Sequence, residues 1–162
     1  MDALKPGDTL TIGPGEYFES VKRANLGSPD ADTVIRAEIH GTALLRGDVP
    51  VPPFRQVPGH RFVYVADFDR DEDVQAVNEL DTLTVYGRSP NIMELDFSPG
   101  KFYHDKTARK LYVSTADLGS ADKQRYTATL AAGSGMELTR PRRTRIEGLA
   151  ATGFSRWGIT LV

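Results

Sequence analysis

Four arginines lie within six residues near the end of the sequence: Arg140, Arg142, Arg143 and Arg145. A guanidinium presents a planar fork of N–H donors that matches carboxylate and sulfate groups. The run would therefore form a face that binds an acidic polysaccharide. In the alternative, which we favour, the run is a turn between strands, and Arg143 and Arg145 point outward and pair with acidic residues of the same chain.

His104 is the histidine best placed for acid–base chemistry. Its neighbours in the sequence include Lys101, Tyr103 and Asp105, which make it a candidate general base or substrate-binding group. Alternatively, it is a polar residue at the end of a strand. The other histidines, His40 and His60, are distant and share no metal-ligand spacing with it, so no metal site built from histidines is expected.

Carboxylates occupy alternate positions in the segment from Asp67 to Asp73, as they do in the first part of a calcium-binding loop. The rest of the pattern differs, because Glu72 stands where the loop needs glycine and Asn78 stands where it needs a bidentate glutamate. The segment is therefore interpreted as a solvated acidic connection. The chain has no cysteine, and Gly13-Pro14-Gly15 is not continued as a phosphate loop, so the residues indicate no cofactor.

The composition is that of an ordinary globular protein. The 162 residues carry 20 Lys+Arg against 22 Asp+Glu, a formal net charge of -2, which gives no electrostatic argument for nucleic acid or an anionic membrane. The sequence contains neither a run of about 18 apolar residues nor a basic segment followed by an apolar run. It therefore shows no membrane span and no signal peptide.

Short alternations of apolar and polar residues, separated by scattered glycines and prolines, predict strands. They cover residues 9–12, 33–39, 61–65, 82–86 and 125–130. A short helical turn is expected near residues 17–23. Residues 100–104 and 110–114 predict a β-hairpin around the polar loop 105–109, with aromatic side chains paired across its strands. These side chains are expected to pack and cover sheet edges, and the alternative is a sugar-stacking platform.

An internal repeat indicates how the strands are arranged. Gly135-Met136-Glu137-Leu138 and Gly158-Ile159-Thr160-Leu161 share one pattern at a spacing of 23 residues, with a further strand at residues 144–149 between them. A period of this size marks stacked supersecondary units, and therefore a solenoid of parallel strands. The period of two within each strand then separates inward from outward residues. The inward residues would be Met136, Leu138, Ile146, Ile159 and Leu161, and the outward ones Glu137 and Thr160.

Residues 4–17, together with residues 33–38 and 44–47, resemble the start of right-handed parallel β-helix proteins of the pectate-lyase-like class. Within that class they are most similar to the family 6 polysaccharide lyases, of the alginate lyase and chondroitinase B type. Residues 99–105 followed by 111–113 look like an insertion of those relatives. Residues 146–149, leading to residues 158–159, resemble their first regular coils.

The resemblance implies an all-β fold, a right-handed parallel β-helix (solenoid), as a single domain. Residues 1–49 would form the N-terminal cap and first coil, residues 50–125 an inserted β-hairpin region, and residues 126–162 the first regular coils. In the lyases, a calcium-binding acidic set and a Lys/Arg pair that removes a proton lie on coils well downstream. None of those residues maps onto this sequence.

The expected function is that of the N-terminal segment of a carbohydrate-active protein, a polysaccharide lyase or glycosidase for acidic glycans that is secreted or periplasmic. Calcium would belong to the longer protein, and this segment alone would be inactive. Its candidate substrate-binding residues are the arginine run and His104. The alternative is a non-catalytic solenoid for binding or adhesion. Self-association through the C-terminal coil edge is also expected, because a terminal strand exposes unpaired backbone.

Overall fold

The computed structural model describes residues 4–130 and 133–162. These residues form an all-β structure, as the sequence predicts, with both parallel and antiparallel strands. They divide into two compact units, the first made of residues 4–48 and 133–162 and the second of residues 49–130. Residues 1–3 and 131–132, which belong to the expected cap and first regular coils, lie outside the described residues.

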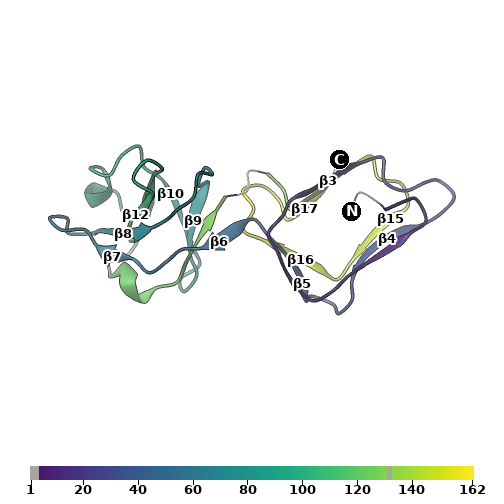
Figure 1. The fold of residues 1–162 in the computed structure, drawn as a ribbon, viewed down its shortest axis with the longest axis horizontal. Coiled ribbons are helices and arrows are strands. Elements are labelled where there is room, and N and C mark those ends of the chain that lie inside the picture. Colours follow the sequence, from purple (N-terminus) through teal and green to yellow (C-terminus); the bar gives the residue numbers. More distant parts are fainter. Residues whose placement is uncertain (1–3, 131–132) are drawn as a thin grey trace. The chain divides into compact units, whose positions relative to one another are not determined.

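Three parallel sheets, each of three strands, build the first unit (Figure 1). Their strands, in order across each sheet, are β1 (Thr9–Ile12), β4 (Thr33–Ala37) and β15 (Thr144–Glu147); β2 (Gly15–Tyr17), β5 (Ala43–Arg46) and β16 (Leu149–Thr152); and β3 (Val21–Ala24), β14 (Met136–Thr139) and β17 (Ile159–Leu161). Each passage of the chain through the unit therefore adds one strand to each sheet. The chain leaves after β5 and returns at β14, and the second unit lies between them in the sequence.

The 23-residue repeat is a pair of stacked strands. β14 and β17 pair in parallel with the two copies of the pattern in register, as Met136–Ile159, Glu137–Thr160 and Leu138–Leu161. The expected parallel stacking of the copies is thus confirmed. The intervening strand, β15, does not lie between them but pairs with β4 in another sheet, because successive strands of one passage belong to different sheets.

The repeat begins with glycine because the chain is crowded at that point. A Cβ at Gly135 would lie 2.6 Å from Cε2 of Phe154 and 2.7 Å from the carbonyl oxygen of Gly158. Gly27 is constrained twice, since its φ is +87° and a Cβ there would lie 1.8 Å from the carbonyl oxygen of Arg142. Side chains at these two positions would force neighbouring passages of the chain apart.

Inward-pointing apolar side chains of the three sheets form the core of the first unit. The buried ones are Leu26, Ile35, Leu45, Met136 and Leu138. Ile146 and Ile159 pack against them, as expected of inward residues. Leu161 differs from the expectation, because its side chain is 62% exposed. It shares the register position of Leu138, but β17 is an edge strand that no further strand of the described chain covers.

The helical turn expected at residues 17–23 is wrong. This segment contains the end of β2 and most of β3, joined by residues 18–20. β2 pairs with β5 and β3 pairs with β14, and the amide of Val21 donates to the carbonyl oxygen of Gly135 at 2.7 Å. Hydrogen bonding to strands that are distant in the sequence therefore overrides the local preference.

The second unit is built on a mixed eight-stranded sheet with the order β6-β13-β9-β10-β11-β12-β8-β7. Its strands are β6 (Asp48–Pro50), β7 (Arg55–Gln56), β8 (Val63–Asp67), β9 (Ala76–Glu79), β10 (Thr84–Arg88), β11 (Lys101–Asp105), β12 (Lys110–Ser114) and β13 (Tyr126–Thr129). Two short 3-10 helices accompany them in this unit, η1 (Leu95–Phe97) and η2 (Ala121–Lys123). β10 and β11 run parallel. The following pairs are antiparallel: β7 with β8, β8 with β12, β12 with β11, β10 with β9, and β9 with β13.

The expected hairpin is confirmed within this sheet. β11 and β12 pair antiparallel, and Tyr103 lies opposite Tyr112. The rings of these tyrosines stack with their centroids 6.1 Å apart, which is the cross-strand aromatic pairing that the sequence predicts. Phe102 faces the other side of the sheet and is fully buried in the core of the unit. The side chains of neighbouring residues in β11 therefore point to opposite faces of the sheet.

β13 is the last strand of the second unit, and β14 is the next strand of the first. Residues 126–129, the start of the segment that the resemblance assigns to the regular coils, form β13 of the eight-stranded sheet. The strands of the first unit resume at Met136.

Within the described part of the chain, no helix has the length and apolar character of a membrane span.

Candidate functional site

The arginine run forms the turn between β14 and β15 and the beginning of β15. Nε of Arg143 donates to Oδ1 of Asp32 at 2.6 Å, and Arg145 donates to Glu147. This is the pairing with acids of the same chain that the favoured alternative expects. Arg140 and Arg142 are exposed side chains of the turn. A role of the run in binding an acidic polysaccharide stays a prediction.

Carboxylates of the acidic segment are paired with basic side chains of the second unit. Asp67 accepts hydrogen bonds from Arg55, at 3.1 Å, and from Lys110, and these bonds lower its pKa to about 2. Asp69 pairs with Arg109. Over residues 4–130 and 133–162, the structure brings together no group of three or more His, Asp or Glu residues that could hold a metal ion.

His104 lies near the end of β11, on the face of the sheet that carries Phe102. Its ring packs edge-on against Phe68, with centroids 5.6 Å apart. After His104, Asp105 caps the hairpin turn by accepting a hydrogen bond from the amide of Ala108 at 2.9 Å. The strand thus holds the imidazole half-buried beside the turn, which also carries Lys106.

A cavity of about 300 Å³ opens beside His104, and we call it the His104 cavity. Its walls are formed by Asp73, Arg88, Ser89, Pro90, Tyr103, His104 and Lys106. Arg88 is the last residue of β10, and its Nη2 donates to the carbonyl oxygen of Val74 at 2.5 Å. Nζ of Lys106 lies 2.8 Å from Oδ1 of Asp73. Two cations and one carboxylate therefore line the cavity.

The imidazole of His104 is held in its neutral form. Burial lowers the pKa of His104, and the charges of Lys106 and Arg88 lower it further, against the opposing effects of Asp73 and Asp105. Its Nε2 atom is buried and has no hydrogen-bond partner among the described residues. Buried polar atoms are seldom left without a partner, so this atom is an unsatisfied hydrogen-bonding group of the ring.

The hydrogen bond from Lys106, together with the charges of Lys106 and Arg88, lowers the pKa of Asp73. Asp73 is therefore ionised at neutral pH, and the cavity keeps a net positive charge. Glycosidases commonly use two carboxyl groups about 5–9.5 Å apart. Of the residues that line this cavity, Asp73 is the one acid, so the arrangement suits binding of an oxyanion better than glycoside hydrolysis.

The partners of His104 in space differ from those that sequence adjacency indicates. Tyr103 lines the cavity, but Asp105 caps the turn, and Nζ of Lys101 lies over Gly87. Asp73 and Arg88, which no pattern in the sequence connects with His104, come from the acidic segment and from the end of β10. In the sequence, Arg88 is marked only by its position at the end of a strand, after the alternating apolar and polar residues 82–86 and before Ser89-Pro90.

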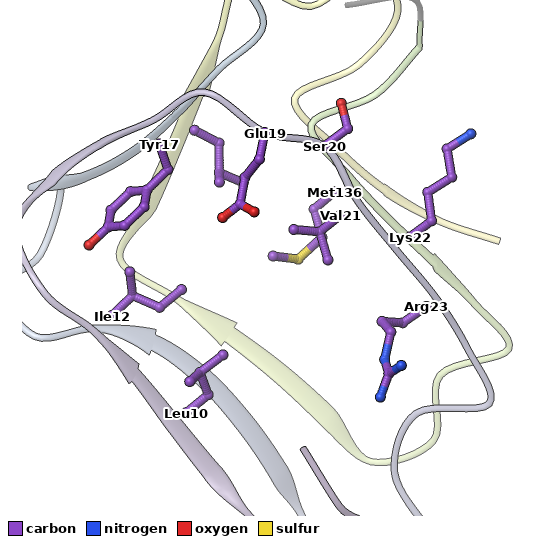
Figure 2. A pocket seen from close by; sticks show the side chains of 10 residues that line it. Leu10, Ile12, Tyr17, Glu19, Ser20, Val21, Lys22, Arg23 and Met136 are labelled. Atoms are coloured by element: carbon purple, nitrogen blue, oxygen red, sulfur yellow. The ribbon is translucent and has the colours of Figure 1, made fainter. Parts of the chain in front are cut away.

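A second cavity, of about 350 Å³, lies in the first unit at the edge formed by β1, β2 and β3 (Figure 2). Leu10, Ile12, Tyr17 and Val21 point into it, and Met136 contributes to its floor. The hydroxyl of Tyr17 donates to the carbonyl oxygen of Gly13 at 2.9 Å. These apolar side chains continue the inward rows of the core. Glu19 and Lys22 also line the cavity and both are exposed, so this cavity is the exposed edge of the core of the unit.

No family model matches the sequence, and no curated protein matches it. Two solved structures are similar in fold. One, described as a glycoside hydrolase, has a TM-score of 0.51 and 12% identity over 92% of this chain and 44% of its own. The other, described as XylC in complex with xylose, has a TM-score of 0.54 and 13% identity over 86% of this chain and 31% of its own. The chain thus spans less than half the length of either structure.

Proposed function

We propose that this chain is the N-terminal part of a right-handed parallel β-helix protein that acts on carbohydrate, either a polysaccharide lyase or a glycosidase for acidic glycans. The observation that carries the proposal is the first unit, in which every passage of the chain adds one strand to each of three parallel sheets. Stacked strands in register are the basis of solenoid folds, which offer extended surfaces to polymeric ligands.

The similar structures support a carbohydrate-active role. One is described as a glycoside hydrolase, and the other was solved with xylose bound. The cationic His104 cavity supports acidic rather than neutral glycans, because Arg88 and Lys106 favour a negatively charged ligand. A single carboxylate in that cavity agrees with a role in binding. Catalysis in the longer protein would then depend on residues outside this cavity.

We also propose that the second unit is an insertion within one coil of the β-helix. It follows β5 in the sequence and precedes β14, and these strands belong to the same passage of the chain. The unit carries its own buried core and its own cavity. It would supply substrate contacts to a β-helix whose coils are themselves a scaffold.

The proposal is tested with this chain and a panel of glycans. Polygalacturonate, alginate and chondroitin sulfate are compared with neutral xylan by affinity electrophoresis and by calorimetry at two salt concentrations. We expect salt-sensitive binding of the acidic glycans, weak or no binding of xylan, and no formation of unsaturated uronate. Absence of binding to every glycan would contradict the proposed function. Turnover by this chain alone would contradict the assignment of catalysis to other residues.

A further inference from the structure

We propose that the His104 cavity binds the carboxylate or sulfate group of an acidic sugar, with Arg88 and Lys106 as its charged ligands and His104 as a hydrogen-bonding partner. The sugar part of this inference depends on the proposed function. The oxyanion part depends on the cavity itself, whose residues come from β10, β11, the hairpin turn and the acidic segment.

Arg88 is held in place before any ligand arrives. Its hydrogen bond to the carbonyl oxygen of Val74, at 2.5 Å, uses one of the five N–H donors of the guanidinium and restrains the position of the group. The remaining donors form a rigid fork that suits a carboxylate or sulfate. Because the fork is already ordered, binding an oxyanion immobilises little additional side chain.

Lys106 already binds a carboxylate in the cavity, that of Asp73, at 2.8 Å. An incoming oxyanion would meet the same ammonium group and would compete with Asp73 for it. Asp73 is well placed to give way, since its side chain is 64% exposed. Asp73 therefore acts as an internal competitor, and its removal should strengthen binding rather than weaken it.

His104 contributes the third contact. Its buried Nε2 atom has no hydrogen-bond partner among the described residues, and the ring is fixed against Phe68. The charged groups around it are Arg88 from β10, Lys106 from the turn, and the carboxylates of Asp73 and Asp105. A bound oxyanion offsets the two cations and therefore favours the imidazolium form. Affinity should therefore rise as the pH falls from the pKa of His104 in the complex toward its lowered pKa in the free chain.

The experiment uses calorimetry with the full chain and three probes: a galacturonate oligomer, a chondroitin sulfate oligomer and inorganic sulfate. We expect Arg88→Gln to lower affinity for the oxyanion probes about tenfold, the loss of one charge-assisted hydrogen bond. Asp73→Asn should raise affinity about threefold, because a competing charge is removed. His104→Gln should flatten the pH dependence of binding. Arg61→Gln, an exposed arginine of the same unit outside the cavity, is the matched control.

The outcomes separate this inference from the proposed function. Glycan binding that Arg88→Gln leaves unchanged would overturn the inference while the proposed function stands. Binding of inorganic sulfate that responds to Arg88 and Asp73, without binding of any sugar, would support the oxyanion site and contradict the proposed function. Arg88→Lys, with thermal unfolding of every variant, shows whether a loss of binding reflects the guanidinium fork or a loss of folding. Because chondroitin sulfate carries both carboxylate and sulfate groups, its binding together with that of inorganic sulfate identifies sulfate as the anion, whereas binding of galacturonate without inorganic sulfate identifies the carboxylate.

Discussion

Glu79 is a nearly inaccessible carboxylate in the second unit, with 2% of its surface exposed. Three hydroxyl groups converge on it: Tyr86 donates to Oε2, Tyr126 donates to Oε2 at 3.4 Å, and Thr82 donates to Oε1 at 2.8 Å. Burial raises the pKa of both tyrosines above the usual value, so that their hydroxyls remain protonated and can donate at neutral and mildly basic pH. Hydroxyl groups thus donate to both carboxylate oxygens of Glu79.

We predict that Tyr86→Phe lowers the free energy of unfolding of the second unit by about 2 kcal/mol. Removing one donor from a buried charged acceptor costs about 1.5–3 kcal/mol. The tyrosine hydroxyl also accepts a hydrogen bond from the amide of Ala116 at 3.1 Å, which the variant loses as well. For a unit of this size, about 2 kcal/mol corresponds to a decrease in Tm of about 8–16 °C.

The measurement is urea unfolding followed by far-ultraviolet circular dichroism and tyrosine fluorescence, with thermal unfolding in parallel. The matched control is Tyr103→Phe, which removes a hydroxyl from the half-buried ring that stacks on Tyr112 and should change stability by less than about 0.5 kcal/mol. In a Glu79→Gln background, the effect of Tyr86→Phe should shrink, because a neutral amide needs the donor less. A Tyr86→Phe variant within about 0.5 kcal/mol of the wild type would refute the reasoning.

Three further predictions concern the glycine repeat, the acidic segment and the last strand. Gly135→Ala should destabilise the first unit by about 2 kcal/mol or more through overpacking, whereas Gly13→Ala, where a Cβ would meet its nearest atom at 3.7 Å, should be close to neutral in thermal unfolding. Because the pKa of Asp67 is lowered to about 2, its ion pairs stabilise the fold fully above the unfolded pKa of about 3.9, and this stabilisation is lost as the pH falls through about 2. Asp67→Asn should therefore lower Tm at neutral pH and lower it much less at pH 2. Leu161→Lys should reduce self-association in light scattering, because Leu161 is 62% exposed on the edge strand β17, and a monodisperse wild-type chain would contradict this expectation.

The sequence alone predicted much of the local structure. The alternation of apolar and polar residues located β1, β4, β8, β10 and β13 to within a few residues, because successive side chains of a strand point to opposite faces. The pattern shared by residues 135–138 and 158–161 predicted a parallel register, since equivalent strands of a stack occupy equivalent environments. The β11–β12 hairpin followed from a short polar loop between two β-rich segments.

Other features depend on contacts between distant residues. The chain at residues 17–23 is extended because β5 and β14 supply hydrogen-bond partners, and nothing in the local sequence specifies those partners. The alternation of Ile159 and Leu161 is the same as that of Met136 and Leu138, yet Leu161 is exposed because its position at a sheet edge is a property of the assembled sheet. Local pattern determines which way a side chain points, and tertiary structure determines whether anything covers it.

The candidate site shows the same division. The sequence by itself singled out His104, because an imidazole among polar residues at a strand end is chemically conspicuous, and it also indicated that the acidic segment was a weak match to a calcium loop. Only the tertiary structure brought Arg88 and Asp73 to the imidazole, since the parallel pairing of β10 with β11 places the end of β10 beside it. The lowered pKa of His104 likewise results from burial and from two cations, of which Arg88 is distant in the sequence. Residue type and periodicity are encoded locally, whereas the charge and the partners of a site arise from the packing of separate strands.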